Sequence, residues 1–213
     1  MTTVLLIAVV GYLLGSIPFG YILVRLFRGT DIRATGSGNI GATNVARSAP
    51  GLGIATLILD AAKGWFAVWI AARLTLALPP ASLAGHSLDQ PILMGVAAFC
   101  AIAGHMFTIW LSFKGGKGVA TGVGAFIALA PKSVLIVLAI FGAIYALTRY
   151  VSLGSIVATA AFPILAMFVD GYRSVPLALP FMFGGAVLII ARHHQNIRRL
   201  LAGTEHRLEM KQR

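Results

Sequence analysis

Long apolar stretches alternate with short polar segments along the whole chain. Five of them are close to the ~20 residues that a helix needs to cross the ~30 Å hydrocarbon core of a bilayer. They cover about residues 4–24, 52–72, 92–112, 153–170 and 175–192. A sixth stretch, 119–148, is too long for one span and has Pro131 and Lys132 near its middle, which predicts two short helices. The pattern therefore predicts an all-α integral membrane protein with seven transmembrane helices.

The distribution of positive charge predicts how these helices are oriented. Thirteen of the 17 Lys and Arg residues lie in three polar islands: residues 25–47, residues 114–117 together with Arg149, and residues 192–213. Cytoplasmic loops of membrane proteins carry an excess of Lys and Arg. The loop 74–91 has no Lys or Arg and is expected on the other side. The basic C-terminus is then cytoplasmic, and an odd number of spans places the N-terminus outside.

The composition supports a membrane protein and argues against other classes. The chain is 58% apolar and 11% charged, with a mean hydropathy of +0.89, which is too apolar for one water-soluble core. A net charge of +11 is typical of nucleic-acid binding in a soluble chain, but here the basic residues flank apolar runs and few aromatic residues lie among them. We expect no nucleic-acid partner. The N-terminus has no basic region or cleavage motif, so its first segment is expected to remain as a helix.

The first island contains a glycine-rich motif, Gly36–Arg47, that includes the pattern G-x-G-x-x-G. A dinucleotide site would need a preceding strand, whereas this island lies between two predicted membrane helices, so we reject that reading. Glycines allow positive φ, and successive backbone N–H groups can bind an anion. Arg47 adds a planar fork suited to phosphate. The candidates for anion contacts here are Gly36, Ser37, Gly38, Asn39, Gly41, Thr43, Asn44 and Arg47. The alternative is a flexible linker with a positive-inside Arg.

The second island lies in the segment Phe113–Thr121, which contains Gly115, Gly116, Lys117 and Gly118 directly before a predicted helix. A helix N-terminus preceded by glycines is a typical anion site. The motif is not a Walker A loop, because Gly118 follows the lysine where Ser or Thr would bind magnesium. We expect no nucleotide, metal or other cofactor. The alternative is that the two lysines of this island simply extend to the membrane surface.

The third island follows the last span and begins with Arg192, His193 and His194. Adjacent histidines point in different directions, and no Cys, Asp or Glu lies nearby in the sequence, so we expect no metal site. If the helix continues, His193 and Asn196 share one face. The alternative is a basic membrane anchor.

Three ionisable residues, Asp60, Lys63 and His105, lie in or at the edge of apolar runs. Charges inside a span are costly, ~2.5–3.5 kcal/mol each on insertion scales, so they usually pair or line a polar cavity. Asp60 and Lys63 are three residues apart and could neutralise each other. A structural role is at least as well supported as a catalytic one.

Taken together, these motifs resemble the PlsY family of bacterial membrane acyltransferases, and the resemblance covers nearly the whole chain. The matching segments are Gly15–Gly20, Gly36–Arg47, Leu59–Asp60 with Lys63–Gly64, Gly104–His105, Phe113–Thr121, Arg149–Leu153, and Arg192–His193 with Asn196. The family's last motif often reads Arg-His-Arg-Glu-Asn, and this chain has His194 and Gln195 in place of the second Arg and the Glu. The replacement leaves open how charge is balanced there.

The resemblance implies a single membrane acyltransferase domain, residues 1–213, that transfers a fatty acyl group from acyl phosphate to glycerol 3-phosphate. The active site would face the cytoplasm, in the bacterial inner membrane. The products would be lysophosphatidate and phosphate, at an early step of phospholipid synthesis. The implied catalytic residues are Ser37, Arg47, Lys117, His193 and Asn196. The implied phosphate-binding residues are Gly36, Gly38, Asn39, Gly41, Gly115, Gly116 and Gly118. Asp60, Lys63, His105, Ser152 and Glu205 are expected in structural or supporting roles.

The implied partners are glycerol 3-phosphate, acyl phosphate and membrane lipid, with the soluble enzyme that makes acyl phosphate as a further candidate. Two other functions fit the residues alone. A transporter of phosphate esters or small anions would also need a basic cytoplasmic pocket, although the chain shows no internal repeat. A structural scaffold would need Arg47 and Lys117 only for folding.

Overall fold

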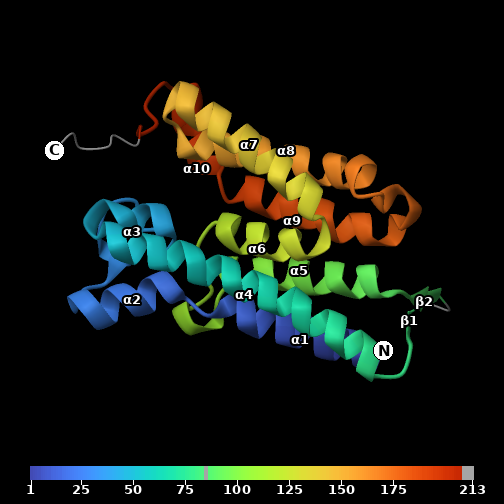
Figure 1. Ribbon diagram of the computed structural model, residues 1–213. Helices are drawn as coiled ribbons and strands as arrows, with labels where there is room; N and C mark the ends of the chain where they lie inside the picture. The colour runs from blue at the N-terminus through green and yellow to red at the C-terminus, as the bar shows by residue number, and fades with distance from the viewer. Residues whose placement is uncertain (84–85, 208–213) are drawn as a thin grey trace.

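The apolar stretches form long helices in the computed structural model, which describes residues 1–83 and 86–207 (Figure 1). The α-helices are α1 (Thr2–Ser16), α2 (Phe19–Arg28), α3 (Ala42–Ser48), α4 (Pro50–Ala77), α5 (Gln90–Met106), α6 (Val119–Leu129), α7 (Pro131–Thr148), α8 (Val151–Val169), α9 (Leu179–Ala191) and α10 (His194–Leu201). Short 3-10 turns are η1 (Ile32–Ala34), η2 (Ile109–Leu111), η3 (Tyr172–Ser174) and η4 (Pro176–Ala178). Strands β1 (Ala81–Leu83) and β2 (His86–Leu88) form an antiparallel hairpin, which the sequence pattern did not predict.

The described residues include five helical segments that are long and apolar enough to cross a membrane, or six if the bent pair formed by Pro176–Ala191 and His194–Leu201 counts as one span. The predicted break in 119–148 is confirmed, since α6 ends at Leu129 and α7 begins at Pro131. The two helices are unequal. α7 has 18 residues and meets the length of a span by itself, whereas α6 has only 11.

The predicted first span, 4–24, is not one continuous helix. It is interrupted at Ile17 and Pro18, because proline has no backbone N–H and disfavours helical geometry in the residue before it. The second part, α2, is amphipathic: Val24 is buried, while Leu26 and Phe27 are largely exposed. Such a helix is suited to the membrane interface.

Small residues allow the central helices to pack backbone against backbone. A Cβ atom on Gly15 would lie 2.1 Å from the carbonyl oxygen of Ala101, so only glycine permits the observed contact of α1 with α5. Gly64 of α4 approaches Thr121 of α6 in the same way. Close approach of this kind is a common source of helix association in lipid. Gly118 and Gly122, which have the same four-residue spacing as Gly11 and Gly15, differ because they face side chains rather than a neighbouring backbone.

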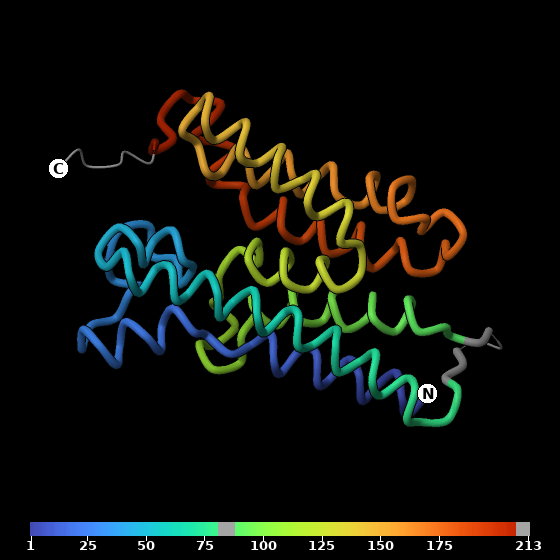
Figure 2. The backbone as a smooth tube through the Cα atoms, in the orientation of Figure 1, coloured from blue at the N-terminus to red at the C-terminus, as the bar shows by residue number. Residues whose placement is uncertain are grey.

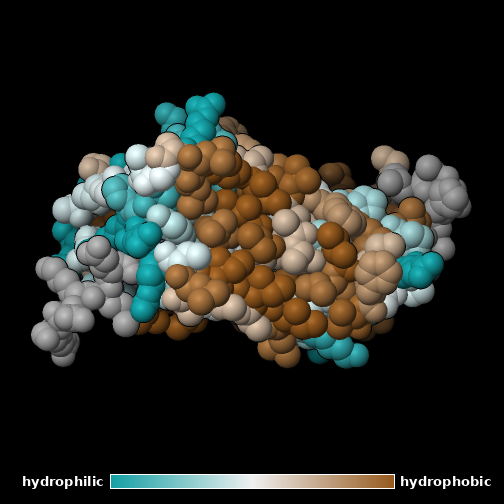
Figure 3. Space-filling model, turned by 90° about the horizontal axis from the view of Figure 1, so that it is seen from above, coloured by the Kyte–Doolittle hydropathy of each residue, from teal (hydrophilic) through white to brown (hydrophobic). Residues whose placement is uncertain are grey.

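The molecule has two ends that differ in character. α2, α3 and α10 lie at one end, on the left in Figure 1, and the start of α1 lies at the other (Figures 1 and 2). The hairpin is at the same end as the start of α1 (Figure 1). On the face drawn in Figure 3, apolar side chains cover the middle and polar residues gather towards the ends. Exposed apolar residues of α4 and α7 include Leu57, Ile58, Leu135 and Leu138. This is the surface that a lipid-embedded bundle requires.

Candidate functional site

The three basic islands, which are far apart in the sequence, meet at the end of the molecule that contains α2, α3 and α10 (Figure 1). The first island forms α3 and the loop before it, the second forms the loop between η2 and α6, and the third forms the junction of α9 with α10. The basic tail beyond Arg207 lies outside the described residues. The clustering that charge alone predicted is therefore present in three dimensions for the described part of the islands.

A hydrogen-bonded chain of polar side chains forms the centre of this end. The Nζ of Lys117 donates to the Oδ1 of Asn196 at 2.6 Å, and the Nδ2 of Asn196 donates to the Oε1 of Glu205 at 2.6 Å. Glu205 also accepts a hydrogen bond from the Oγ of Ser152 at 2.7 Å and forms an ion pair with Arg199 at 2.7 Å. Side chains from four separate segments thus converge here.

The charges around Lys117 are unbalanced in favour of cations. Within the described part of the chain, Arg199, Arg47 and Arg192 all lie close enough to act on it, against the single carboxylate of Glu205. Burial, helped by the three arginines and opposed by Glu205, lowers the pKa of Lys117 to about 8. Burial acts to raise the pKa of Glu205, but the hydrogen bonds from Asn196, Ser152 and Arg199 outweigh it, so the pKa is lowered. Four cations against one carboxylate form a site that favours a dianionic ligand such as a phosphate.

The glycines of the second island are required by close contact with the end of α5. The N–H of Gly115 donates to the Met106 carbonyl at 3.0 Å, and the N–H of Gly116 donates to the His105 carbonyl at 3.1 Å. A Cβ on Gly116 would lie 2.1 Å from the Nε2 of His105. The guanidinium of Arg192 then holds this loop from the other side, donating to the carbonyl of Gly115 at 3.1 Å. These contacts fix the position of the adjoining Lys117.

The first island forms a tight loop before α3. Gly36 and Gly38 have φ of 55° and 68°, as predicted for a glycine-dependent turn. The side chain of Asn44 folds the loop: its Oδ1 accepts from the N–H of Ser37 at 2.9 Å, and its Nδ2 donates to the carbonyl of Asn39 at 2.8 Å. Asn44 is thus used within the loop, although the sequence suggested it as an anion donor.

Two more backbone N–H groups of this loop have partners inside it. The N–H of Gly38 donates to the carbonyl of Thr35 at 3.0 Å, and the N–H of Gly41 donates to the Oδ1 of Asn39 at 2.8 Å. Ser37 and Arg47 are exposed at the surface of this end.

His193 lies at the junction between α9 and α10 and is buried. Helix α9 ends at Ala191 and the chain bends by 55° before α10, so the continuous helix considered from sequence is not formed. His193 and Asn196 are nevertheless both buried at this end. The Nδ1 of His193 lies 2.8 Å from the carbonyl oxygen of Ile189. A carbonyl oxygen only accepts, so Nδ1 carries the proton, and in the neutral imidazole Nε2 is then an acceptor.

The ionisable residues inside the bundle form one buried cluster. Lys63 and Asp60 pair at 2.7 Å, as their spacing predicted. The Nζ of Lys63 also lies 3.0 Å from the Nδ1 of His105 and donates to the carbonyl of Ile17 at 2.6 Å. Ile17 is the residue where α1 ends, so Lys63 satisfies a carbonyl that the break leaves without a helical partner. The cluster joins α1, α4 and α5 directly beneath the Gly115–Gly116 loop.

Sequence reasoning singled out Lys117, Asn196, Ser152 and Glu205, which the structure places in one network. It did not single out Arg192 and Arg199, which hold the glycine loop and Glu205. Their position in the third island was the available signal. Among the residues that the structure describes, no group of three or more His, Cys, Asp or Glu could hold a metal ion.

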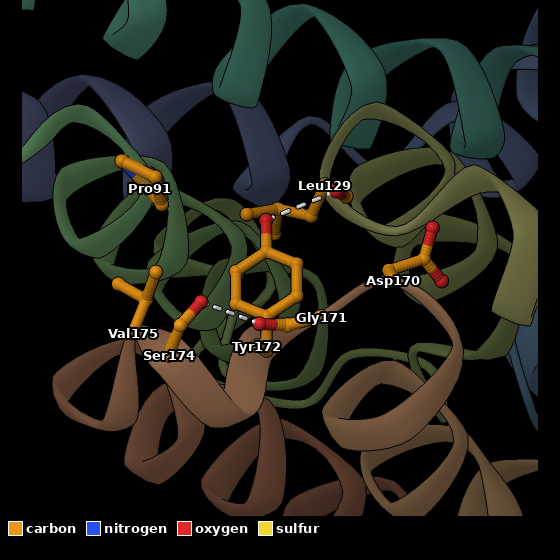
Figure 4. A pocket seen from close by; sticks show the side chains of 7 residues that line it. All are labelled: Pro91, Leu129, Asp170, Gly171, Tyr172, Ser174 and Val175. Carbon is orange, nitrogen blue, oxygen red and sulfur yellow. Dashed lines mark hydrogen bonds between the residues drawn. The ribbon is translucent and has the colours of Figure 1, made fainter.

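A cavity of about 250 Å³ lies at the opposite end of the molecule (Figure 4). Its lining residues are Pro91, Leu129, Asp170, Gly171, Tyr172, Ser174 and Val175. The hydroxyl of Tyr172 donates to the carbonyl of Leu129 at 3.0 Å, and the Oγ of Ser174 donates to the carbonyl of Gly171 at 2.8 Å, so both hydroxyl groups are engaged within the protein (Figure 4). None of the predicted site residues lines this cavity.

The fold and the cationic cluster define an integral membrane protein of bundled helices with basic residues gathered at one end. The family model described as "Glycerol-3-phosphate acyltransferase" matches residues 5–203. A curated glycerol-3-phosphate acyltransferase of Geobacter sulfurreducens is 47% identical over 98% of this chain and 100% of its own length, and one of Syntrophotalea carbinolica is 45% identical over the same shares. The protein belongs to the glycerol-3-phosphate acyltransferase family.

Solved structures agree with this assignment. The chain is similar to the crystal structure of PlsY (YgiH), an integral membrane glycerol 3-phosphate acyltransferase, in its glycerol 3-phosphate form, with a TM-score of 0.83 and 37% identity. That match covers 97% of this chain and 96% of the other. The lysophosphatidic acid form of PlsY gives a TM-score of 0.79 and 36% identity, covering 97% and 95%. An all-helical membrane fold of this type is therefore shown for this chain.

Proposed function

We propose that this protein transfers a fatty acyl group from acyl phosphate to glycerol 3-phosphate, forming 1-acyl-glycerol 3-phosphate and phosphate. The convergence of Lys117, Asn196 and three arginines at one end of the bundle carries the proposal. Both substrates carry phosphate, and this cluster has the charge to bind it. The acyl chain can stay in the surrounding lipid while the phosphate group enters the polar end.

Arg47 and Lys117 bind the phosphate of glycerol 3-phosphate in this scheme, helped by the glycine loops around residues 36–41 and 115–118. Ser37 and Asn196 orient the glycerol. Arg47 acts electrostatically on Lys117, which supports a shared ligand for the two cations. A bound dianion would offset their mutual repulsion.

The reaction needs a nucleophile, a carbonyl and a leaving group held together. The glycerol hydroxyl oxygen attacks the acyl carbonyl carbon, the bond from that carbon to the phosphate oxygen breaks, and phosphate leaves with the hydroxyl proton. Acyl phosphate is already activated, so proximity and charge stabilisation supply much of the catalysis. We place His193 beside this hydroxyl, because its Nε2 can accept a hydrogen bond while Nδ1 is held by Ile189.

We propose seven crossings by a single membrane domain, residues 1–213, and the positions of the loops support this count. Lys117 lies at the basic end, whereas Ser133 of the next helix contacts Asp170 at the other, so the chain crosses the bundle in α6 despite its short length. α7 returns the chain to Tyr150, which lies near Arg207 at the basic end. Counting α1 with α2 as one crossing, we propose an external N-terminus and a cytoplasmic active site in the bacterial inner membrane. A soluble enzyme that makes acyl phosphate is a candidate partner at this face.

Acyl transfer by the purified, detergent-solubilised protein tests the proposal. Acyl phosphate, acyl-CoA and acyl carrier protein are offered separately with labelled glycerol 3-phosphate, and the lipid extract is analysed. We expect lysophosphatidate from acyl phosphate. Product from another donor alone would refute the proposed donor, and no product from any donor with folded protein would refute the proposed reaction.

A further inference from the structure

Among the residues that the structure describes, Glu205 is the one carboxylate in the hydrogen-bonded network around Lys117, and its side chain is only 7% exposed. It follows α10, 88 residues beyond Lys117 in the chain. Ser152 of α8 and Arg199 of α10 hold its two oxygens, one on Oε1 and one on Oε2. The carboxylate is therefore fixed in place by two groups other than Asn196.

The orientation of the Asn196 amide follows from its two neighbours. A lysine ammonium has only donors, and an ionised carboxylate has only acceptors. The amide can satisfy both only with Oδ1 towards Lys117 and Nδ2 towards Glu205, which is the arrangement observed. Resting on the function proposed above, we propose that Glu205 is a positioning residue for acyl transfer, which locks the Asn196 amide in the orientation that presents its oxygen to Lys117 and the glycerol.

Glu205 also balances the charge at this end. Lys117 is faced by Arg199 from α10, Arg47 from α3, Arg192 from the end of α9, and the neighbouring His193. Glu205 is the only group among them that favours the charged ammonium, by raising the pKa of Lys117 against the effects of burial and of the arginines. Its removal therefore has two consequences: Asn196 loses its fixed orientation, and Lys117 loses its proton at a lower pH.

E205Q tests both consequences with little change in shape. A glutamine has one acceptor oxygen for two donors: with that oxygen towards Asn196 its amide nitrogen faces Arg199, and with the oxygen towards Arg199 the nitrogen faces the Nδ2 of Asn196. We expect kcat/KM for glycerol 3-phosphate to fall about 10- to 100-fold, mainly through KM, as for loss of a charge-assisted hydrogen bond. The alkaline limb of the pH profile should move to lower pH. E205D keeps the charge and should keep the wild-type limb.

The control is D170N, which makes the same chemical change at the other end of α8, where Asp170 accepts from Ser133 and Lys132. We expect its kcat/KM and pH limb to match the wild type. In an N196A background, E205Q should lower kcat/KM by a much smaller factor than it does in the wild type, because positioning acts through Asn196. The proposal would be overturned if E205Q kept kcat/KM within about twofold of the wild type with an unshifted alkaline limb of the pH profile. It would also be overturned if the losses of kcat/KM from E205Q and N196A simply added as free energies.

Direct titration of Lys117 by NMR of ¹³C-methylated lysines, assigned with K117R among the five lysines of the chain, provides a readout that does not depend on turnover. We expect a lower pKa for Lys117 in E205Q and no change in D170N. An unchanged value in E205Q counts against the inference, whereas inactivity of the wild type with every donor counts against the proposed reaction. If E205Q does not fold, S152A removes one of the bonds to Glu205: a raised KM with the wild-type limb supports positioning, and wild-type kinetics overturn it.

Discussion

A carboxylate with several hydrogen-bond partners lies at each end of helix α8, and the two carboxylates differ in what surrounds them. Near its start, Ser152 donates to Glu205, and at its end Asp170 accepts from the backbone and side chain of Ser133. Each carboxylate binds a serine hydroxyl. The bond alone therefore does not distinguish a functional site from a structural one.

The remaining partners make the distinction. Asp170 accepts from the N–H groups of Lys132 and Ser133. These donors lie in the first turn of α7, where backbone N–H groups have no partner within the helix, so Asp170 caps that helix. Glu205 accepts from Asn196 and Arg199, side chains that belong to a cluster with excess positive charge. Mutations at the two ends should therefore separate activity from stability.

The largest effect is expected for K117M at the basic end. Methionine keeps most of the volume of lysine but cannot donate to a phosphate or to Asn196. By analogy with the loss of one preorganised donor, we expect kcat/KM for glycerol 3-phosphate to fall about 100- to 1,000-fold. Initial rates across a range of glycerol 3-phosphate concentrations measure this, with thermal unfolding to check the fold. Near-normal kinetics would show that the cationic cluster is not the binding site.

The pH dependence should give a tenfold effect per unit. Because the pKa of Lys117 is lowered to about 8, its ammonium is lost as the pH rises through that value. Phosphate monoesters carry their second charge above about pH 6, so kcat/KM should be highest between about pH 6 and about 8 and fall above it. K117R retains its proton throughout and should lack this alkaline limb, although its maximum is lower. A limb that persists in K117R would assign it to another group.

A smaller effect is expected for G116A, which tests whether the packing of the Gly115–Gly116 loop against the end of α5 is needed to position Lys117. The added Cβ would lie 2.1 Å from the Nε2 of His105, and the loop or the imidazole must move. We expect a loss of about 1–3 kcal/mol in unfolding free energy, as for overpacking, and a raised KM for glycerol 3-phosphate. G142A is the matched control, because its Cβ meets nothing within 4 Å. Equal behaviour of the two variants would contradict the role given to the loop.

The sequence predicted the helical membrane fold and the break before Pro131, because long apolar runs and proline act locally. The same local rule explains why the predicted span at residues 4–24 is not one continuous helix, since Pro18 interrupts it between α1 and α2. The pairing of Asp60 with Lys63 was predicted from spacing. The bond of Lys63 to Ile17, 46 residues away, depends on how α1 and α4 pack, which periodicity does not determine.

For the candidate site, residue chemistry predicted Lys117 as part of an anion site, and the family resemblance added Asn196. The sequence did not predict that Arg192 donates to the carbonyl of Gly115, nor that the side-chain amide of Asn44 forms hydrogen bonds within its own loop. Both depend on where carbonyl groups lie in space. A motif thus indicates which side chains have suitable chemistry, whereas the tertiary structure decides which of them are already engaged.

The smallest effect on activity is expected for D170N, at the end opposite the cationic cluster. An amide in place of the carboxylate can still accept one hydrogen bond but places donors opposite the N–H groups that start α7. We expect a loss of about 1 kcal/mol in unfolding free energy, typical of a weakened helix cap, with kcat/KM unchanged. Thermal unfolding and initial rates on one preparation measure both quantities. A drop in kcat/KM in fully folded D170N would mean that the two ends of α8 are coupled. The assignment of Glu205 to the functional site and of Asp170 to a structural cap would then be wrong.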